Sequence, residues 1–408
     1  MNEIYSKGVL RIPHSFVRVL FLTIAVYLSY SPFTIATSGD GLSANYFFVL
    51  IPIYYLFKEM RMVLPHKDLM LVMLSFGLLF TMASILQVEY WEIFYRKLTS
   101  FLLFFTAFLF AFIRVDDKMI LAFKLGTALF TILLSFDNLF EYRSFDVEEL
   151  GYAAKTQVGN QRFGFMYVFV FWLVLFYKSN SQFIQLAKIP ALILLFTGIF
   201  LTFSRASVVS FALSLMVLSY HFIRAKNLFN LRFIMLLMVY ALIVFLIVFF
   251  TGYYEYLFIP FQFFGERFNE LISGEGINLS NMYTSEGYRL YLLREILLYV
   301  STSPIYGSGY LGIWILFEDQ VGSAHGQFND ILFRTGVIGL VVYFYLLVKI
   351  LRFLKTNDFG MYIGFWGIIF FGLFHETFKL GHGAFILAFI IGMWASSMRK
   401  DNKIKVLP

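Results

Sequence analysis

The chain has 408 residues, of which 60% are hydrophobic, 21% aromatic and 14% charged, and it contains no cysteine. Its mean hydropathy is +0.77 and its formal net charge is +7. Globular proteins average about 45–50% apolar and about 25% charged residues, and even a large soluble domain buries only about three quarters of its surface. The composition therefore excludes a soluble enzyme and a disordered scaffold, and it predicts a polytopic helical membrane protein.

The fold class that we expect is all-α, with a single integral membrane domain over residues 1–408. A helix needs roughly 20 apolar residues to cross a hydrocarbon core of about 30 Å. The uninterrupted apolar runs at 101–112 and 236–250 do not fit the alternating strands of a β-barrel. In chain order, the predicted spans are 16–38, 45–57, 69–86, 98–115, 119–139, 163–177, 187–203, 206–223, 231–252, 331–351, 359–374 and 380–398.

The orientation of these spans follows from the distribution of charge. Lys and Arg concentrate in one set of alternate connections, which includes both ends of the chain, whereas Asp and Glu prevail in the other set. The positive-inside rule places the basic set in the cytoplasm, and both termini with it. The first apolar stretch lacks a small-residue cleavage site, so we expect a retained anchor. The basicity is mainly this orientation signal, and no nucleic-acid partner is predicted.

Two polar segments, at about 140–162 and 253–330, lie on the outer side in this topology. The first ends near Arg162, which we expect at the level of the membrane surface. The second separates the ninth and tenth spans and is the longest polar stretch. Chemistry is therefore predicted on the outer side.

Arg205 stands between two apolar runs with almost no loop, in Phe203-Ser-Arg-Ala-Ser207. The pattern predicts a tight helical hairpin with Arg205 near the outer surface. An Arg at mid-membrane costs about 2.5–3.5 kcal/mol on insertion scales. Arg205 is therefore either an interfacial side chain that reaches lipid phosphates or a clamp on a lipid-linked phosphate, which the guanidinium fork matches.

An amphipathic helix is predicted near 286–303 within the long outer loop, on the plane of the membrane, from the spacing of Leu290, Leu293, Ile296, Leu297 and Val300. Pro304 and a Gly-rich turn over 307–312 follow it. Arg289 is expected in the first turn, beside free backbone N–H groups that favour an anion. Arg294 lies about 140° further around the helix, so the two cannot easily bind one ligand from the same face. Arg289 is the preferred anion ligand, and a solvated surface helix is the alternative.

His325 and Asn329 precede the tenth span, and they share a face if the helix has already begun there. A His is the side chain most readily poised near neutral pH to take a proton from a hydroxyl. The alternative is a structural His at the membrane surface. Further along, Gly336 and Gly339 are expected to allow close helix packing.

His375, Glu376 and His382 flank the last outer turn. Their spacing is not that of a helical zinc motif, and adjacent residues project in different directions. The absence of cysteine excludes thiolate ligands and disulfides. We therefore predict neither a metal nor a cofactor.

Taken in order, the motifs resemble those of the O-antigen ligase and polymerase superfamily. Leu201-Thr-Phe-Ser-Arg-Ala-Ser207 is similar to the Thr-x-Ser-Arg-Gly signature of that family. The segments 288–295 and 303–309 resemble its Arg-bearing helix and Pro-x-x-Gly-x-Gly turn, and 324–339 resembles its His-Asn…Leu…Gly-x-x-Gly block. The resemblance covers roughly residues 196–395. Gly326 and Ala206 depart from the pattern, and Asn329 is the candidate to supply the amide that an Asn at 326 would carry.

The resemblance implies a GT-C-like bundle of about twelve spans in the bacterial inner membrane. It also implies a metal-independent glycosyltransferase that acts at the periplasmic face on a glycan carried by undecaprenyl pyrophosphate. Membrane lipid and a chain-length regulator protein are the other implied partners. Arg205 and Arg289 would hold the pyrophosphate, and His325 would deprotonate the acceptor hydroxyl. The remaining candidates are Glu286, which is the alternative base, and the substrate-binding residues Arg162, Asn329 and Arg294.

Two alternatives stay open at this point. An O-antigen polymerase extends a lipid-linked repeat unit for lipopolysaccharide, whereas a ligase attaches the glycan to lipid A–core. The aromatic-rich composition favours the polymerase. The alternative from another class is a transporter or flippase of lipid-linked sugars, which often has two related halves. No such halves are seen here, and the distinctive residues gather on one side of the membrane.

Overall fold

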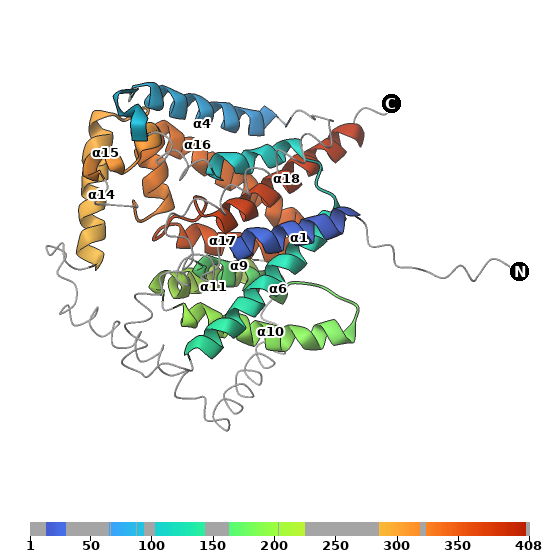
Figure 1. Ribbon diagram of the computed structural model, residues 1–408. Coiled ribbons are helices and arrows are strands. Elements are labelled where there is room, and N and C mark those ends of the chain that lie inside the picture. Colours follow the sequence, from blue (N-terminus) through green and yellow to red (C-terminus); the bar gives the residue numbers. More distant parts are fainter. Residues whose placement is uncertain are drawn as a thin grey trace, which may run out of the picture.

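The computed structural model describes residues 14–29, 65, 67–86, 88–93, 103–142, 163–202, 204–224, 285–318 and 324–404 (Figure 1). These residues form helices, turns and connections, and none of them is in a strand. The prediction of an all-helical protein is confirmed for this part of the chain.

Most of the predicted spans lie on described apolar helices. In the described part of the chain, six helices are long and apolar enough to cross a membrane: α4 (Lys67–Ile85), α6 (Asp117–Tyr142), α10 (Gln182–Leu201), α11 (Arg205–Arg224), α16 (Gln327–Asn357) and α18 (Gly381–Ile404). The same part of the chain has four shorter apolar helices: α1 (His14–Ser29), Leu103–Phe112, α9 (Gly164–Leu175) and α17 (Phe359–Phe371). The predicted spans 45–57 and 231–252 lie outside the described residues, so the total of about twelve stays a prediction.

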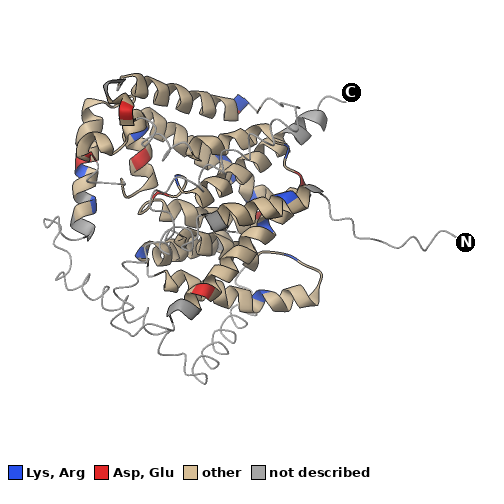
Figure 2. Ribbon diagram, viewed as in Figure 1, with Lys and Arg blue, Asp and Glu red and all other residues tan. Residues whose placement is uncertain are grey.

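The helices divide into a buried centre and an exposed periphery. On α4, Leu74 is 67% exposed, whereas Val72 and Phe76 on the opposite face are buried. One face of α4 is thus apolar and exposed, and the opposite face is apolar and buried. Such a helix suits the edge of a bundle, where its exposed face contacts lipid. Figure 2 shows α4 without charge over nearly its whole length. In contrast, α9 and the span of α18 are buried on almost every side and form the centre of the bundle.

The helices run in directions that agree with an even number of crossings. In Figure 1, α1 begins and α18 ends at the same side of the bundle, on the right. That this side faces the cytoplasm stays a prediction from the charge asymmetry in the sequence. At the opposite side, on the left, α14 (Ser285–Thr302) runs across the direction of α4, beside α15 (Trp314–Phe317).

The buried stripe of α14 differs from the predicted spacing. Leu292, Ile296 and Val300 are buried in a cluster with Phe333 of α16, whereas Leu297 is 50% exposed. The stripe therefore follows an i, i+4, i+8 row that faces α16. Leu298, beside Leu297, is also 50% exposed, as expected of a helix at a membrane surface.

A kink in α16 joins this helix to the turn after α14. Gly336 has a φ of +66°, and the Val337 N–H donates to the Pro304 carbonyl over 2.8 Å. In a regular helix that N–H would bond to the Phe333 carbonyl, which here accepts from the Ser308 N–H over 2.7 Å. The close approach at Gly336 is therefore to a turn. The predicted role of Gly336 in helix–helix packing is wrong, because the turn occupies that place.

Gly336→Ala should destabilise the protein, because a Cβ at this position would lie 2.6 Å from the Pro304 carbonyl oxygen at a positive φ. A strained backbone of this kind costs about 1–3 kcal/mol. Gly77→Ala in α4 is the matched control, since nothing lies within 4 Å of its added Cβ, and Ala in a helix is favoured by roughly 0.5–1 kcal/mol. Thermal unfolding in detergent, followed by circular dichroism, measures both; equal midpoints would contradict the role given to Gly336.

Candidate functional site

A helical hairpin carries Arg205. α10 ends at Leu201 and α11 begins with Arg205 itself, so the hairpin has the predicted tightness. The buried Thr202 hydroxyl donates to the Ile199 carbonyl over 2.7 Å and lies 3.1 Å from the Ser207 hydroxyl. These bonds hold the turn, and the Arg205 side chain is left exposed at the start of α11.

The starts of α11 and α16 lie at the same end of the bundle. Gly164, at the start of α9, leaves no room for a Cβ between the first turn of α11 and the end of α17. The end of α17 also meets the first residue of α16, because the Gln327 N–H donates to the Gly372 carbonyl over 2.7 Å. Arg205 and His325, just before α16, are therefore at the end of the bundle that carries α14.

His325 lies in a turn rather than in the helix. Its φ is +49°, and α16 begins only at Gln327, so the condition under which His325 and Asn329 would share a helix face is not met. The Gln327 side-chain oxygen accepts from the backbone N–H groups of Thr377 and Phe378 over 3.0 and 2.9 Å. This anchor fixes the start of α16. A left-handed backbone at a non-Gly residue costs about 1–3 kcal/mol and is concentrated at functional sites.

The structure brings His325 together with Arg289. The Tyr288 ring meets the His325 ring edge to face at 5.8 Å. Burial, and then the Arg289 charge, lower the pKa of the His325 imidazole, while the Glu376 carboxylate acts in the opposite direction. Both of the lowering effects favour the neutral imidazole, which can accept a proton. Arg289 is the fifth residue of α14, so the free N–H groups of the first turn precede it, contrary to the expectation from the sequence.

The other predicted site residues are placed less centrally. Arg294 is exposed on α14. The Asn329 amide lies beside Gly326, since a Cβ at 326 would be 3.2 Å from its nitrogen. An amide is therefore present next to the position at which the family pattern has Asn. Arg162 and the side chain of Glu286 lie outside what the structure describes.

A buried chain of ion pairs, which we did not predict, lies beneath this turn. Asp330 is 1% exposed, and both of its carboxylate oxygens are 3.1 Å from Arg334 Nε. Lys379 Nζ lies 3.2 Å from Asp330 and 2.9 Å from Glu376. The sequence did contain a signal, because Asp330 and Arg334 are a charged i, i+4 pair at the start of an apolar span. Their partners after α17 could not be read from it.

Both ends of this chain of ion pairs form hydrogen bonds with the backbone. Arg334 Nη1 donates to the carbonyls of Gly309 and Tyr310 over 3.2 and 2.8 Å. At the other end, Glu376 Oε1 accepts from the Ala324 N–H over 3.1 Å. The chain thus joins the turn after α14 to the residue that precedes His325.

The two histidines near Glu376 have other surroundings. The fully buried His382 ring stacks on Phe163 at 4.4 Å and on Phe165 at 4.8 Å. The His375 ring stacks on Phe371 at 5.0 Å. Among the described residues, no group of three His, Asp or Glu side chains is arranged to hold a metal ion.

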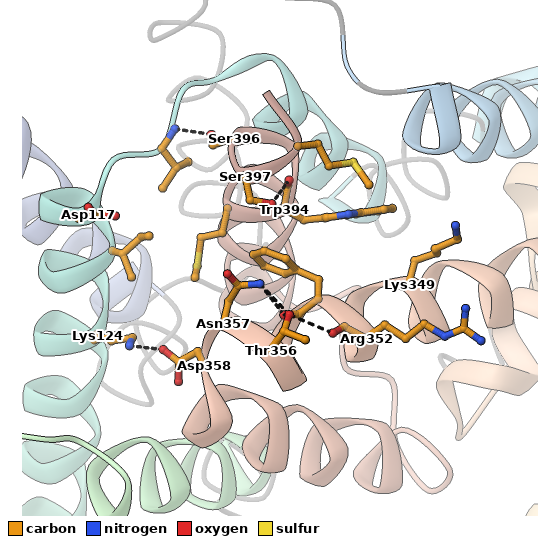
Figure 3. A pocket seen from close by; sticks show the side chains of 15 residues that line it. Asp117, Lys124, Lys349, Arg352, Thr356, Asn357, Asp358, Trp394, Ser396 and Ser397 are labelled. Atoms are coloured by element: carbon orange, nitrogen blue, oxygen red, sulfur yellow. Dashed lines mark hydrogen bonds and ion pairs between the residues drawn. The ribbon is translucent and has the colours of Figure 1, made fainter. Parts of the chain in front are cut away.

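A cavity of about 650 Å³ lies at the opposite end of α16, between α6, α16 and α18 (Figure 3). Lys124 points to Asp358 and is paired with it, and Lys349 Nζ lies 2.6 Å from Asp68. These cations are thus matched by carboxylates. None of the site residues predicted from the sequence lines this cavity.

These observations define a polytopic helical membrane protein in which a histidine, an arginine and a buried ion-pair chain meet at one end of the bundle. Residues 190–344 match the family model described as O-antigen ligase. The resemblance drawn from the sequence is therefore confirmed over the segment that contains Arg205, Arg289 and His325. Glu376 and Lys379 lie beyond the matched range. A comparison with curated proteins gives no match.

Asp330→Asn should destabilise the protein strongly, because it withdraws the carboxylate that Arg334 and Lys379 share in a buried place. Removing one partner of a buried ion pair costs about 3–5 kcal/mol. Asp68→Asn is the control, since its pair with Lys349 is partly exposed, with side chains 19% and 29% accessible, and exposed pairs contribute about 0–1 kcal/mol. Unfolding midpoints in detergent measure both variants. Similar losses would show that burial does not determine how much each ion pair stabilises the protein.

Proposed function

We propose that the protein is an O-antigen polymerase, a glycosyltransferase that acts on undecaprenyl-pyrophosphate-linked glycan at the periplasmic face of the bacterial inner membrane. The observation that carries the proposal is the place of His325, in a left-handed turn beside Arg289 and within the range that matches the ligase family. The family match supports a ligase- or polymerase-type membrane enzyme alike.

In the proposed reaction the acceptor hydroxyl oxygen attacks the anomeric carbon of the donor glycan. The bond from that carbon to the pyrophosphate oxygen breaks, and its electron pair leaves with the lipid pyrophosphate. The hydroxyl proton passes to the His325 imidazole, which is poised in its neutral form by burial and by Arg289. Attack from the face opposite the leaving group inverts the anomeric centre.

Arg205 and Arg289 would stabilise the departing pyrophosphate. Its departure builds negative charge, and preorganised cations in a poorly hydrated site stabilise such charge effectively. A guanidinium offers two parallel N–H groups to a phosphate, which a point charge does not. Two arginines from α11 and α14 would thus supply cationic stabilisation without a metal ion. Asn329, Arg294, Arg162 and Glu286 are the proposed further contacts to the glycan.

The polymerase is favoured over the ligase by the aromatic content of 21%, which is typical of polymerases in this superfamily. The two activities differ only in the acceptor. Lipopolysaccharide from a deletion strain separates them, because loss of a polymerase leaves single repeat units attached and loss of a ligase leaves none. An unsubstituted core in the deletion strain would favour the ligase.

Arg205→Ala, Arg289→Ala and His325→Ala should each abolish or strongly reduce chain extension while the protein stays inserted and abundant. Loss of one preorganised charge-stabilising donor costs about 10²–10³ in rate, and loss of a general base about 10²–10⁴. Arg352→Ala, an exposed Arg at the other end of α16, is the control and should complement fully. The glycan ladder of the complemented deletion strain is the measurement.

Wild-type chain lengths in both arginine variants would refute the pyrophosphate clamp. A neutral His325→Ala would move the base elsewhere, with Glu286 next. Purified protein given undecaprenyl-pyrophosphate repeat units should produce longer glycans. Movement of these lipids between leaflets, with no new linkage, would favour the transporter.

A further inference from the structure

Glu376 lies where three parts of the protein meet: the turn before α16, the turn after α17, and the buried ion-pair chain. We propose that Glu376 is the positioning residue of His325, holding the turn that presents the imidazole and balancing the positive charge that the imidazole acquires with a proton. The inference rests on the proposed function, in which His325 is the general base.

The first argument is geometric. Glu376 Oε1 accepts from the Ala324 N–H over 3.1 Å, and Ala324 directly precedes His325. The same oxygen lies 2.9 Å from Lys379 Nζ. The Glu376 side chain is only 13% exposed. A carboxylate held by two donors in a mostly buried place has little freedom, so the backbone that leads into His325 is held with it.

The second argument concerns the charge behind Glu376. Arg334, Asp330, Lys379 and Glu376 alternate in sign along one chain of contacts, and their charges sum to zero. Charges removed from water are tolerated when they are paired and hydrogen-bonded in this way. Because Lys379 is shared by Asp330 and Glu376, the Glu376 carboxylate is tied to the start of α16. Its position is therefore set by the rigid part of the bundle.

The third argument concerns His325 itself. Arg289 and Glu376 are the charged groups that act on it, and the Tyr288 ring meets its ring. The other ionisable groups on the segments packed at this end are His375 and Lys379 after α17 and Asp330 and Arg334 on α16, and Lys379 and Asp330 join Arg334 to Glu376. Arg289 disfavours a proton on His325, whereas Glu376 favours it. When His325 takes the acceptor's proton, a cation forms beside Arg289 in a half-buried place. Glu376 is the carboxylate that offsets this charge.

The pKa of His325 is the direct test, measured by NMR on protein with isotope-labelled histidine, with the His325 signal assigned by its loss in His325→Ala. Glu376→Gln keeps an oxygen that can accept from Ala324 but removes the charge, so the pKa of His325 should fall by on the order of one unit. Arg289→Gln should raise it. Asp68→Asn, the same change of charge at the other end of the bundle, should leave it unchanged.

The pH dependence of chain extension is the second test. The active imidazole is neutral, so the rate should rise with pH through a His325 pKa that lies below the ordinary value of about 6.5. In Glu376→Gln the acid limb should move to lower pH. An equal loss at every pH, with no movement of that limb, would indicate a merely structural residue and overturn the inference.

Lys379→Met serves as the second variant if Glu376→Gln does not fold. It removes the cation that neutralises Glu376, so the pKa of His325 should rise. An unchanged pKa in either folded variant overturns the inference. Because the NMR measurement needs no substrate, the expected pKa shifts in a protein that never extends chains would refute the proposed function while the placement of Glu376 stands.

Discussion

The buried carboxylate of Asp330 is the contact on which this end of the molecule depends. It binds Arg334 in its own helix and Lys379 after α17, in a place with almost no access to water. A lone charge there would be very costly, and pairing offsets that cost only when the geometry is good. The three side chains therefore fix one another, and the backbone segments that carry them are fixed with them.

Two irregular backbone positions sit on either side of this contact. His325 has a left-handed conformation before α16, and Gly336 interrupts the helix nine residues after Gln327. Backbone polar groups that lose their helical partners in a buried place must find other partners within the protein. They do so here, since the Pro304 carbonyl and the Ser308 N–H take up the groups released at the kink. The segment after α14 thus supplies the hydrogen-bond partners that α16 lacks at its kink.

The same arrangement places the candidate site at the end of the helical bundle. α14 lies across the end of the bundle and brings Arg289 and Tyr288 to His325, while the ion-pair chain reaches the site from the rigid centre. One side of such a site is the rigid bundle, and the other side is α14. This arrangement suits a ligand whose lipid tail lies in the membrane and whose polar head is outside it.

Sequence patterns alone predicted the helical class, the limits of most described apolar helices and the resemblance over the segment that contains Arg205, Arg289 and His325. Hydropathy is a property of each stretch alone, so α10, α11 and α17 could be placed within a few residues. The surroundings of Gly336, the start of α16 and the contacts of Asp330, Lys379 and Glu376 became visible only in the folded protein. Charge pairs between residues some fifty positions apart leave no local pattern, because they depend on which helix ends meet. Even so, they determine where the His325 side chain is held and how tightly it binds a proton.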